Sequence, residues 1–209
     1  MPKTVKKPPY PNPNDLAKYK KQMFLFCQAI AQFTLADWSF YKDRLKVAVF
    51  GKGDYLCLEG QVENYVSFTI FGSWKGYVIN AKGNQICYQF AFENEFVSSY
   101  FSFLTRQPSR LTIEALEPTL VLQISHNLLN EGYQSLKAGE RLGRVSSEWL
   151  FMMKENREIN FVIKKLAKIR YQEFKERYPN HYHKLMDKDI ASYLGISAGY
   201  FSKLKNGKV

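Results

Sequence analysis

The stretch DKDIASYLGISAGYFSKLKNG, residues 187–207, carries two short helical patterns on either side of a glycine. Apolar positions before Gly195 predict a first helix, and the glycine supplies the positive φ that a sharp helix end requires. Ser197 is placed to cap a second helix whose apolar face holds Phe201. Ala191 provides the small residue at which two helices can approach closely. These landmarks predict a helix-turn-helix motif, and a plain helical hairpin is the alternative.

The second helix of this motif offers polar side chains suited to the major groove of DNA. Tyr200, Ser202 and Lys203 lie on its outward face as candidates for contacts with base edges. Basic residues at its end and the amides of its first turn would contact phosphates. The candidate DNA-binding residues are Ser197, Tyr200, Ser202, Lys203, Lys205, Asn206 and Lys208. Ala198 and Gly199 offer bases no side-chain hydrogen bond, so we expect a weak or shape-driven sequence preference.

Basic residues are concentrated at the same C-terminal end of the chain. The chain has 209 residues and a formal net charge of +11. Residues 137–209 hold 16 Lys and Arg against 8 Asp and Glu, whereas residues 1–136 hold 14 against 11. A basic region on a nearly neutral body is typical of proteins that bind a polyanion. A solvated helical surface would show the same pattern, so charge alone does not decide between them.

A heptad pattern upstream of the motif predicts a long helix with a partner helix. Its positions recur from Leu142 to Leu166 at alternating steps of three and four. One face of a single straight helix drifts from such a period by about 20° per heptad, so the pattern implies a second helix. Asn156 stands at a seam position where a paired amide would fix the register of a parallel homodimer; the alternative is an intramolecular helix with Asn156 at its wet edge. The predicted dimer seam is Leu142, Val145, Trp149, Met152, Asn156, Ile159 and Ile163.

Between residues 45 and 125 the apolar period changes to two, which indicates β-strands. Turn signals rich in glycine, asparagine and proline separate the alternating runs, which lie at residues 66–70, 86–92, 111–115 and 120–124. Short strands closed by tight turns indicate an antiparallel architecture rather than a parallel sheet. The expected fold class is α+β, with an antiparallel β-roll or jelly roll, flanking helices, a long dimerisation helix and an all-α C-terminal helix-turn-helix domain.

The predicted domain organisation has four parts. A flexible arm occupies residues 1–14, a sensory β-roll domain 15–136, the dimerisation helix 137–166, and the helix-turn-helix domain 167–209. The sequence contains no run of about 18 apolar residues that would span a membrane. The N-terminal lysines are followed by no apolar segment of the kind found in secretory signals. We therefore expect a cytoplasmic protein without a membrane partner.

The sequence predicts no catalytic site, cofactor or metal site. Cys27, Cys57 and Cys87 lie far apart and outside any CxxC pair, which indicates buried reduced thiols. Metal-dependent jelly-roll enzymes need several converging histidines and carboxylates, but the β-rich region contains no histidine. His181 and His183 follow the strands and lack a third ligand nearby. The sequence also lacks a P-loop, a nucleophile elbow and a dinucleotide-binding glycine pattern.

The order of these parts resembles the Crp/Fnr family of bacterial transcription regulators. The resemblance covers about residues 15–209, and its most specific pieces are KGDYLCLEG at 52–60, FENEFVSSYFSFLTRQPSRLTIEA at 92–115, and the helix-turn-helix motif. It implies a fold of the cyclic-nucleotide-binding type and promoter binding as a homodimer. We expect double-stranded DNA and a second copy of the chain as partners, RNA polymerase as a further partner, and an effector of unknown identity.

The effector region departs from the pattern of family members that bind cyclic nucleotides. In those members a Gly-Glu pair holds the ribose and an Arg-Ser pair holds the cyclic phosphate. The resemblance aligns these pairs with Ser98-Ser99 and with Ser109-Arg110, the second in inverted order, and makes Ser98, Ser99, Ser109 and Arg110 candidates for an effector pocket. Without the ribose acceptor and with a displaced guanidinium, we expect no cAMP binding. The alternative function is a sensor or adaptor whose C-terminal helices bind protein rather than DNA.

Overall fold

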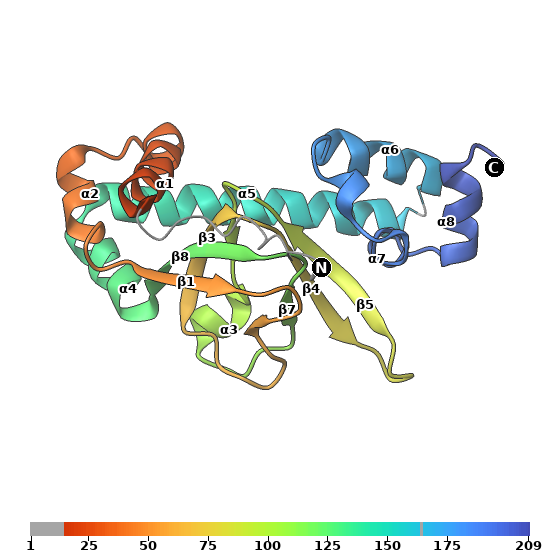
Figure 1. Cartoon of the computed structure of the whole chain (residues 1–209), viewed down its shortest axis with the longest axis horizontal. Helices are drawn as coiled ribbons and strands as arrows, with labels where there is room; N and C mark the ends of the chain where they lie inside the picture. The colour runs from red at the N-terminus through yellow and green to blue at the C-terminus, as the bar shows by residue number, and fades with distance from the viewer. Residues whose placement is uncertain (1–14, 164) are drawn as a thin grey trace, which may run out of the picture. The chain divides into compact units, whose positions relative to one another are not determined.

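The computed structural model describes residues 15–163 and 165–209, which fall into two compact units (Figure 1). The first unit contains the described residues up to Gly76 together with Phe90–Val145, and the second contains Tyr77–Gln89 and Ser146–Val209. The predicted arm at residues 1–14 lies outside the described residues. None of the helices within the described ranges is long and apolar enough to cross a membrane. The α+β class is confirmed.

The described strands form two four-stranded sheets, with strand orders β1-β8-β3-β6 and β2-β7-β4-β5. They are β1 (Lys46–Phe50), β2 (Tyr55–Cys57), β3 (Tyr65–Phe71), β4 (Trp74–Ile79), β5 (Gln85–Ala91), β6 (Phe96–Val97), β7 (Thr112–Ala115) and β8 (Thr119–Ser125). Strand β8 pairs antiparallel with β1 and β3, so that Leu122 lies opposite both Val47 and Phe68. The predicted antiparallel arrangement is confirmed.

Eight α-helices accompany these strands in the described ranges. They are α1 (Leu16–Ala31), α2 (Leu35–Tyr41), α3 (Tyr100–Thr105), α4 (His126–Ser135), α5 (Lys137–Val162), α6 (Ala167–Arg177), α7 (Asp187–Tyr193) and α8 (Ala198–Lys205). Helix α5 begins where the dimerisation helix was predicted to begin, but it ends at Val162 rather than at Leu166. Leu166 instead occupies the N-cap position of α6.

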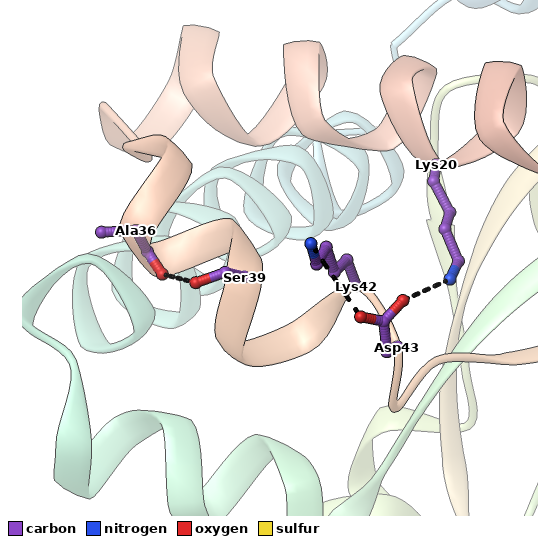
Figure 2. Close-up of polar contacts among 5 residues, drawn as sticks. All are labelled: Lys20, Ala36, Ser39, Lys42 and Asp43. Atoms are coloured by element: carbon purple, nitrogen blue, oxygen red, sulfur yellow. Dashed lines mark hydrogen bonds and ion pairs between the residues drawn. The ribbon is translucent and has the colours of Figure 1, made fainter.

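Polar side chains fix the connection between α1 and α2 in the first unit. Thr34 and Asp37 form a capping box: Thr34 Oγ1 accepts from Asp37 N at 3.1 Å, and Asp37 Oδ2 accepts from Thr34 N at 2.9 Å. Asp43, just after α2, has its Oδ1 3.2 Å from Lys20 Nζ and its Oδ2 4.0 Å from Lys42 Nζ. Figure 2 shows Asp43 facing both lysines. Such exposed ion pairs contribute about 0–1 kcal/mol each to stability, so the capping box is the better indication of where α2 begins.

The alternating apolar residues that predict β3 face the helices rather than the space between the sheets. Phe68 of β3 lies in one buried cluster with Met23 of α1. The intervening Thr69 is also buried, and its Oγ1 accepts a hydrogen bond from the Trp74 indole at 3.2 Å. A second, smaller core between the strands contains Trp74 and Val121. Strand β3 is therefore buried on both faces, and only one of them is apolar throughout.

Strand β5 differs from its predicted alternation. The sequence places Ile86 and Tyr88 on the apolar face, yet Ile86 is 39% exposed and Cys87 is buried. The reason is that Tyr77–Gln89, the end of the β4–β5 hairpin, packs with the second unit. The first unit thus contains the predicted β-roll domain without this hairpin end, together with residues 137–145 of the predicted dimerisation helix. Each of the cysteines in the described ranges is a buried thiol outside any disulfide, as predicted.

Candidate nucleic-acid interface

The predicted helix-turn-helix forms from α7 and α8. Gly195 follows α7 with a φ of +66°, and Ser197 Oγ accepts from the backbone N–H of Tyr200 at 3.1 Å. Ala191 is buried, and its carbonyl accepts from Ile196 N at 3.0 Å across the turn. The positive φ of the glycine and the serine cap are therefore confirmed by the structure.

The inner face of α8 is held by aromatic packing within the second unit. Phe201 has no exposed surface. Its ring centre lies 5.0 Å from that of Tyr171 on α6, and the two rings are arranged edge to face. Phe174 of α6 contacts the ring of Tyr193 on α7 at 5.3 Å. Aromatic pairs of this kind add about 0.5–1.5 kcal/mol beyond the area that they bury. Helix α6 therefore fixes both helices of the motif and orients the outer face of α8.

The outer face of α8 is open to solvent. Tyr200 is 42% exposed, and Ser202, Lys203 and Lys208 are also exposed. Within the described part of the chain, the side chains of these four residues form no hydrogen bond or ion pair. They are the predicted DNA-binding residues that stay available to a ligand.

Two other predicted DNA-binding residues have partners inside the motif. Lys205 Nζ lies 2.8 and 3.1 Å from the carboxylate oxygens of Asp187 at the start of α7, and this hydrogen bonding raises the pKa of Lys205. Asn206 Nδ2 donates to the carbonyl of Ser202 at 2.8 Å. These contacts tie the end of α8 to the motif itself, so they reduce the number of side chains free to meet DNA.

The end of the β4–β5 hairpin contacts the first helix of the motif. Ser192 Oγ on α7 accepts from the backbone N–H of Cys87 at 2.9 Å and lies 3.5 Å from the carbonyl oxygen of Gln85. The partners are 105 and 107 residues apart in the chain. The hydroxyl of α7 thus joins the backbone of β5, a contact for which the sequence gives no signal.

Arg157 of α5 also contacts the motif, and nothing in the sequence pattern predicts this role. Its guanidinium carbon lies 4.6 Å from the ring centre of Tyr193, 4.9 Å from Phe161 and 5.7 Å from Tyr88. It also donates to the carbonyl of Tyr193 at 3.1 Å. Arginine commonly stacks on aromatic rings in this way. Arg157 therefore connects α5, α7 and the hairpin within the second unit.

The predicted dimer seam lies largely open along α5. Trp149, Met152, Asn156, Ile159 and Ile163 are exposed, and Val145 is half-buried. Leu142 differs, because it is only 6% exposed and belongs to the apolar core of the first unit. Its side chain is therefore not available to a partner helix. The apolar stripe that a partner could cover begins after it.

The effector-pocket candidates do not form an open anion site. Ser99 and Ser109 are buried with their hydroxyl oxygens 2.6 Å apart, and Ser98 Oγ donates to the carbonyl of Tyr65 at 3.0 Å. Arg110 is exposed, with its guanidinium carbon 5.2 Å from the ring centre of Phe101. The structure brings the two buried serines together and leaves the guanidinium on the surface.

A buried carboxylate lies near these serines and was not found from the sequence. Glu63 is 4% exposed, and its Oε1 accepts from the backbone N–H groups of Asn64 and Tyr65, both at 3.0 Å. Its Oε2 has no hydrogen-bond partner in the described part of the chain. Burial raises the pKa of Glu63 above its ordinary value of 4.5, although the backbone donors oppose this.

The raised pKa of Glu63 predicts a pH-dependent contribution to stability. A raised folded-state pKa stabilises the fold at low pH, and this stabilisation is lost as the pH rises through that pKa. As the pH rises through the raised pKa of Glu63, the free energy of unfolding of Glu63→Gln should therefore increase relative to that of wild type. Urea denaturation of both proteins at several pH values measures this difference. A difference that does not change with pH would contradict the assignment.

Comparisons with known proteins agree with this architecture. Residues 47–135 match the family of the cyclic nucleotide-binding domain. No curated protein sequence gives a significant match. Among solved structures, FixK2 from Bradyrhizobium japonicum is similar with a TM-score of 0.65 and 17% identity, over 78% of this chain and 83% of that one.

Two further structures show the same fold. The c-di-GMP-responsive global regulator CLP from Xanthomonas campestris has a TM-score of 0.65 and 10% identity, over 83% of this chain and 91% of that one. A protein from Eubacterium rectale assigned to the Crp/Fnr family has a TM-score of 0.63 and 15% identity, over 84% and 83% of the two chains. Residues 47–135 are therefore similar to the cyclic nucleotide-binding domain, and the chain shares its fold with solved bacterial regulators, one of which is assigned to the Crp/Fnr family.

Proposed function

We propose that the chain is a non-catalytic transcription regulator that binds double-stranded DNA as a homodimer. The observation that carries this proposal is the outer face of α8, which is exposed, bears Lys203 and is held by a capped helix-turn-helix. A helix mounted in this way can enter the major groove while the rest of the motif contacts phosphates. The excess of lysine and arginine after residue 136 supplies the attraction to the duplex.

The homodimer would form through α5 and the residue that follows it, because the seam from Val145 to Ile163 presents an apolar stripe to solvent. If two α5 helices pack in parallel, a twofold axis relates the two α8 helices of the dimer. Recognition helices of such dimers enter successive major grooves about 34 Å apart, so the binding site would be roughly palindromic. RNA polymerase is the further partner that a promoter-bound dimer would meet.

The first unit would act as the sensory domain. The contacts of Ser192 with the β5 backbone and of Arg157 with Tyr88 join the end of the β4–β5 hairpin to the motif within the second unit, and β4 and β5 continue along the chain into the first unit. An effector can shift the dimer between two arrangements only through unequal affinity for them. Because Ser99 and Ser109 are buried against each other and Arg110 lies at the surface, cAMP is not the proposed effector.

Lys203→Ala is expected to weaken DNA binding without dissociating the dimer. Loss of a groove contact costs about 1–3 kcal/mol, which is roughly a fivefold to 150-fold rise in Kd. Fluorescence anisotropy with a duplex retained by the purified protein measures the effect. Lys52→Ala removes the same charge from an exposed position in the first unit and serves as the matched control. Equal affinities of the two variants would refute the groove role of Lys203.

A salt titration separates this function from the adaptor alternative. Neutralising phosphates releases counterions, so log Kd should rise steeply and linearly with log salt concentration. A binding partner that is a protein would give a far smaller slope. Mapping the genomic fragments that the purified protein retains would supply the duplex for these measurements. Failure to retain any fragment in dilute buffer would refute DNA binding.

A further inference from the structure

Gly199, in the first turn of α8, is not required by the fold. It is exposed, and an added Cβ would meet no atom within 4 Å in the described part of the chain. Its φ lies outside the left-handed region, so the backbone does not need a glycine there. Glycine in a helix is less stable than alanine because it loses more backbone entropy on folding. This helix therefore carries a destabilising residue that packing and conformation do not explain.

The residues on either side make the first turn of α8 apolar. Ala198 presents a methyl group, and Tyr200 presents a ring that is 42% exposed. The hydroxyl of Ser197 already caps the helix. The donors at the other end of the helix, Lys205 and Asn206, have partners inside the motif. At the start of α8, the side chains that can form hydrogen bonds are therefore the capping Ser197 and the hydroxyl of Tyr200.

The same face of α8 carries the ammonium group of Lys203, the proposed groove contact. Lys203 lies four positions after Gly199 and three after Tyr200, so the three residues share one face of the helix. Lys203 has no hydrogen bond or ion pair in the described part of the chain. The first turn of this face has few side-chain atoms, and a lysine follows one turn later. Such a face would allow the first turn of α8 to approach base edges closely.

The chemistry of the major groove identifies what such a turn can recognise. The 5-methyl of thymine is the apolar group on the major-groove edges of the bases, and small or aromatic side chains recognise it by contact. Resting on the proposed function, we propose that Ala198, Gly199 and Tyr200 select thymine through its methyl group, and that Gly199 lets the helix backbone approach it. Recognition then depends on apolar contact more than on hydrogen bonds.

Replacing thymine by uracil tests this selection, because it removes the methyl group and keeps the base-pairing edge. The probe is the duplex that the purified protein retains most tightly, with uracil substituted at all thymines. Burial of one methyl group corresponds to about a fourfold change in affinity. The Kd should therefore rise about fourfold for each methyl group contacted, and an unrelated duplex should show no such difference.

Gly199→Leu tests the close approach of the backbone. Leucine favours helix and has open space at this position in the free protein, so the thermal midpoint should stay equal or rise by a few degrees. Affinity for the thymine duplex should fall at least about fourfold, and the preference over uracil should shrink toward one. A variant that keeps both the affinity and the preference would overturn the inference.

The outcomes separate this inference from the function on which it rests. Equal affinity of the wild-type protein for the thymine and uracil duplexes would overturn thymine selection and leave DNA binding intact. Binding to neither duplex in dilute buffer would refute the proposed function itself.

Discussion

Gly195→Ala is expected to unfold the helix-turn-helix and abolish DNA binding. Gly195 has a φ of +66°, and a left-handed conformation costs a residue with a side chain about 1–2 kcal/mol. An added Cβ would also lie 2.5 Å from Cε1 of Phe161, and such overpacking costs about 1–3 kcal/mol. The combined loss of about 2–5 kcal/mol would remove most or all of the stability of a small unit.

Phe161 cannot easily move away from the added methyl group. Its ring contacts two cations, with the guanidinium carbons of Arg157 and Arg170 at 4.9 and 5.2 Å from the ring centre. A shift of the ring would weaken both cation–π contacts and, through Arg157, its contacts with Tyr193. The cost is therefore not relieved by a change of a single side chain.

Gly207→Ala is the matched control for this prediction. Gly207 has a nearly equal φ of +68°, but an added Cβ would meet no atom within 4 Å in the described residues. It should therefore show only the conformational cost of about 1–2 kcal/mol. Urea unfolding followed by circular dichroism compares the two variants. If both lose the same stability, the contact with Phe161 is not the cause.

The helix-turn-helix could be predicted from the sequence because its determinants are local. The cap of Ser197 reaches the N–H of Tyr200 three residues later, and Gly195 sets the turn by its own backbone conformation. The alternation in β3 is local in the same sense, since it follows from the period of a strand. Patterns of this kind depend on neighbours in the chain and not on the rest of the fold.

Other features of the site could not be predicted because they join distant segments. The hydrogen bond from Cys87 to Ser192 spans 105 residues. Ser192 lies in the predicted helix-turn-helix, but neither it nor Cys87 follows a sequence pattern that indicates this partner. The cation–π contacts of Arg157 likewise depend on which rings the fold brings to α5. The heptad period placed Leu142 in the seam, but the core of the first unit contains it. A period identifies an apolar face and does not say which partner covers it.

Ile159→Glu is expected to convert the proposed dimer into a monomer. Ile159 is 50% exposed on α5 and lies in the middle of the predicted seam. In a symmetric dimer the substitution would bury two unpaired carboxylates, each of which costs several kcal/mol. The dimer Kd should rise by at least about a hundredfold. Analytical ultracentrifugation over a range of protein concentrations measures this change.

Phe151→Glu is the matched control, because Phe151 lies on the same helix and is 65% exposed but stands outside the seam. It should leave the dimer intact, and equal dissociation of both variants would contradict the assignment of the seam.

Asn156→Val tests whether the Asn156 amides of the two protomers pair inside the seam. A buried asparagine lowers stability but fixes register and strand number, so valine should raise stability and allow assemblies of other sizes. Unchanged mass and unchanged stability would show that Asn156 does not pair with its symmetry mate.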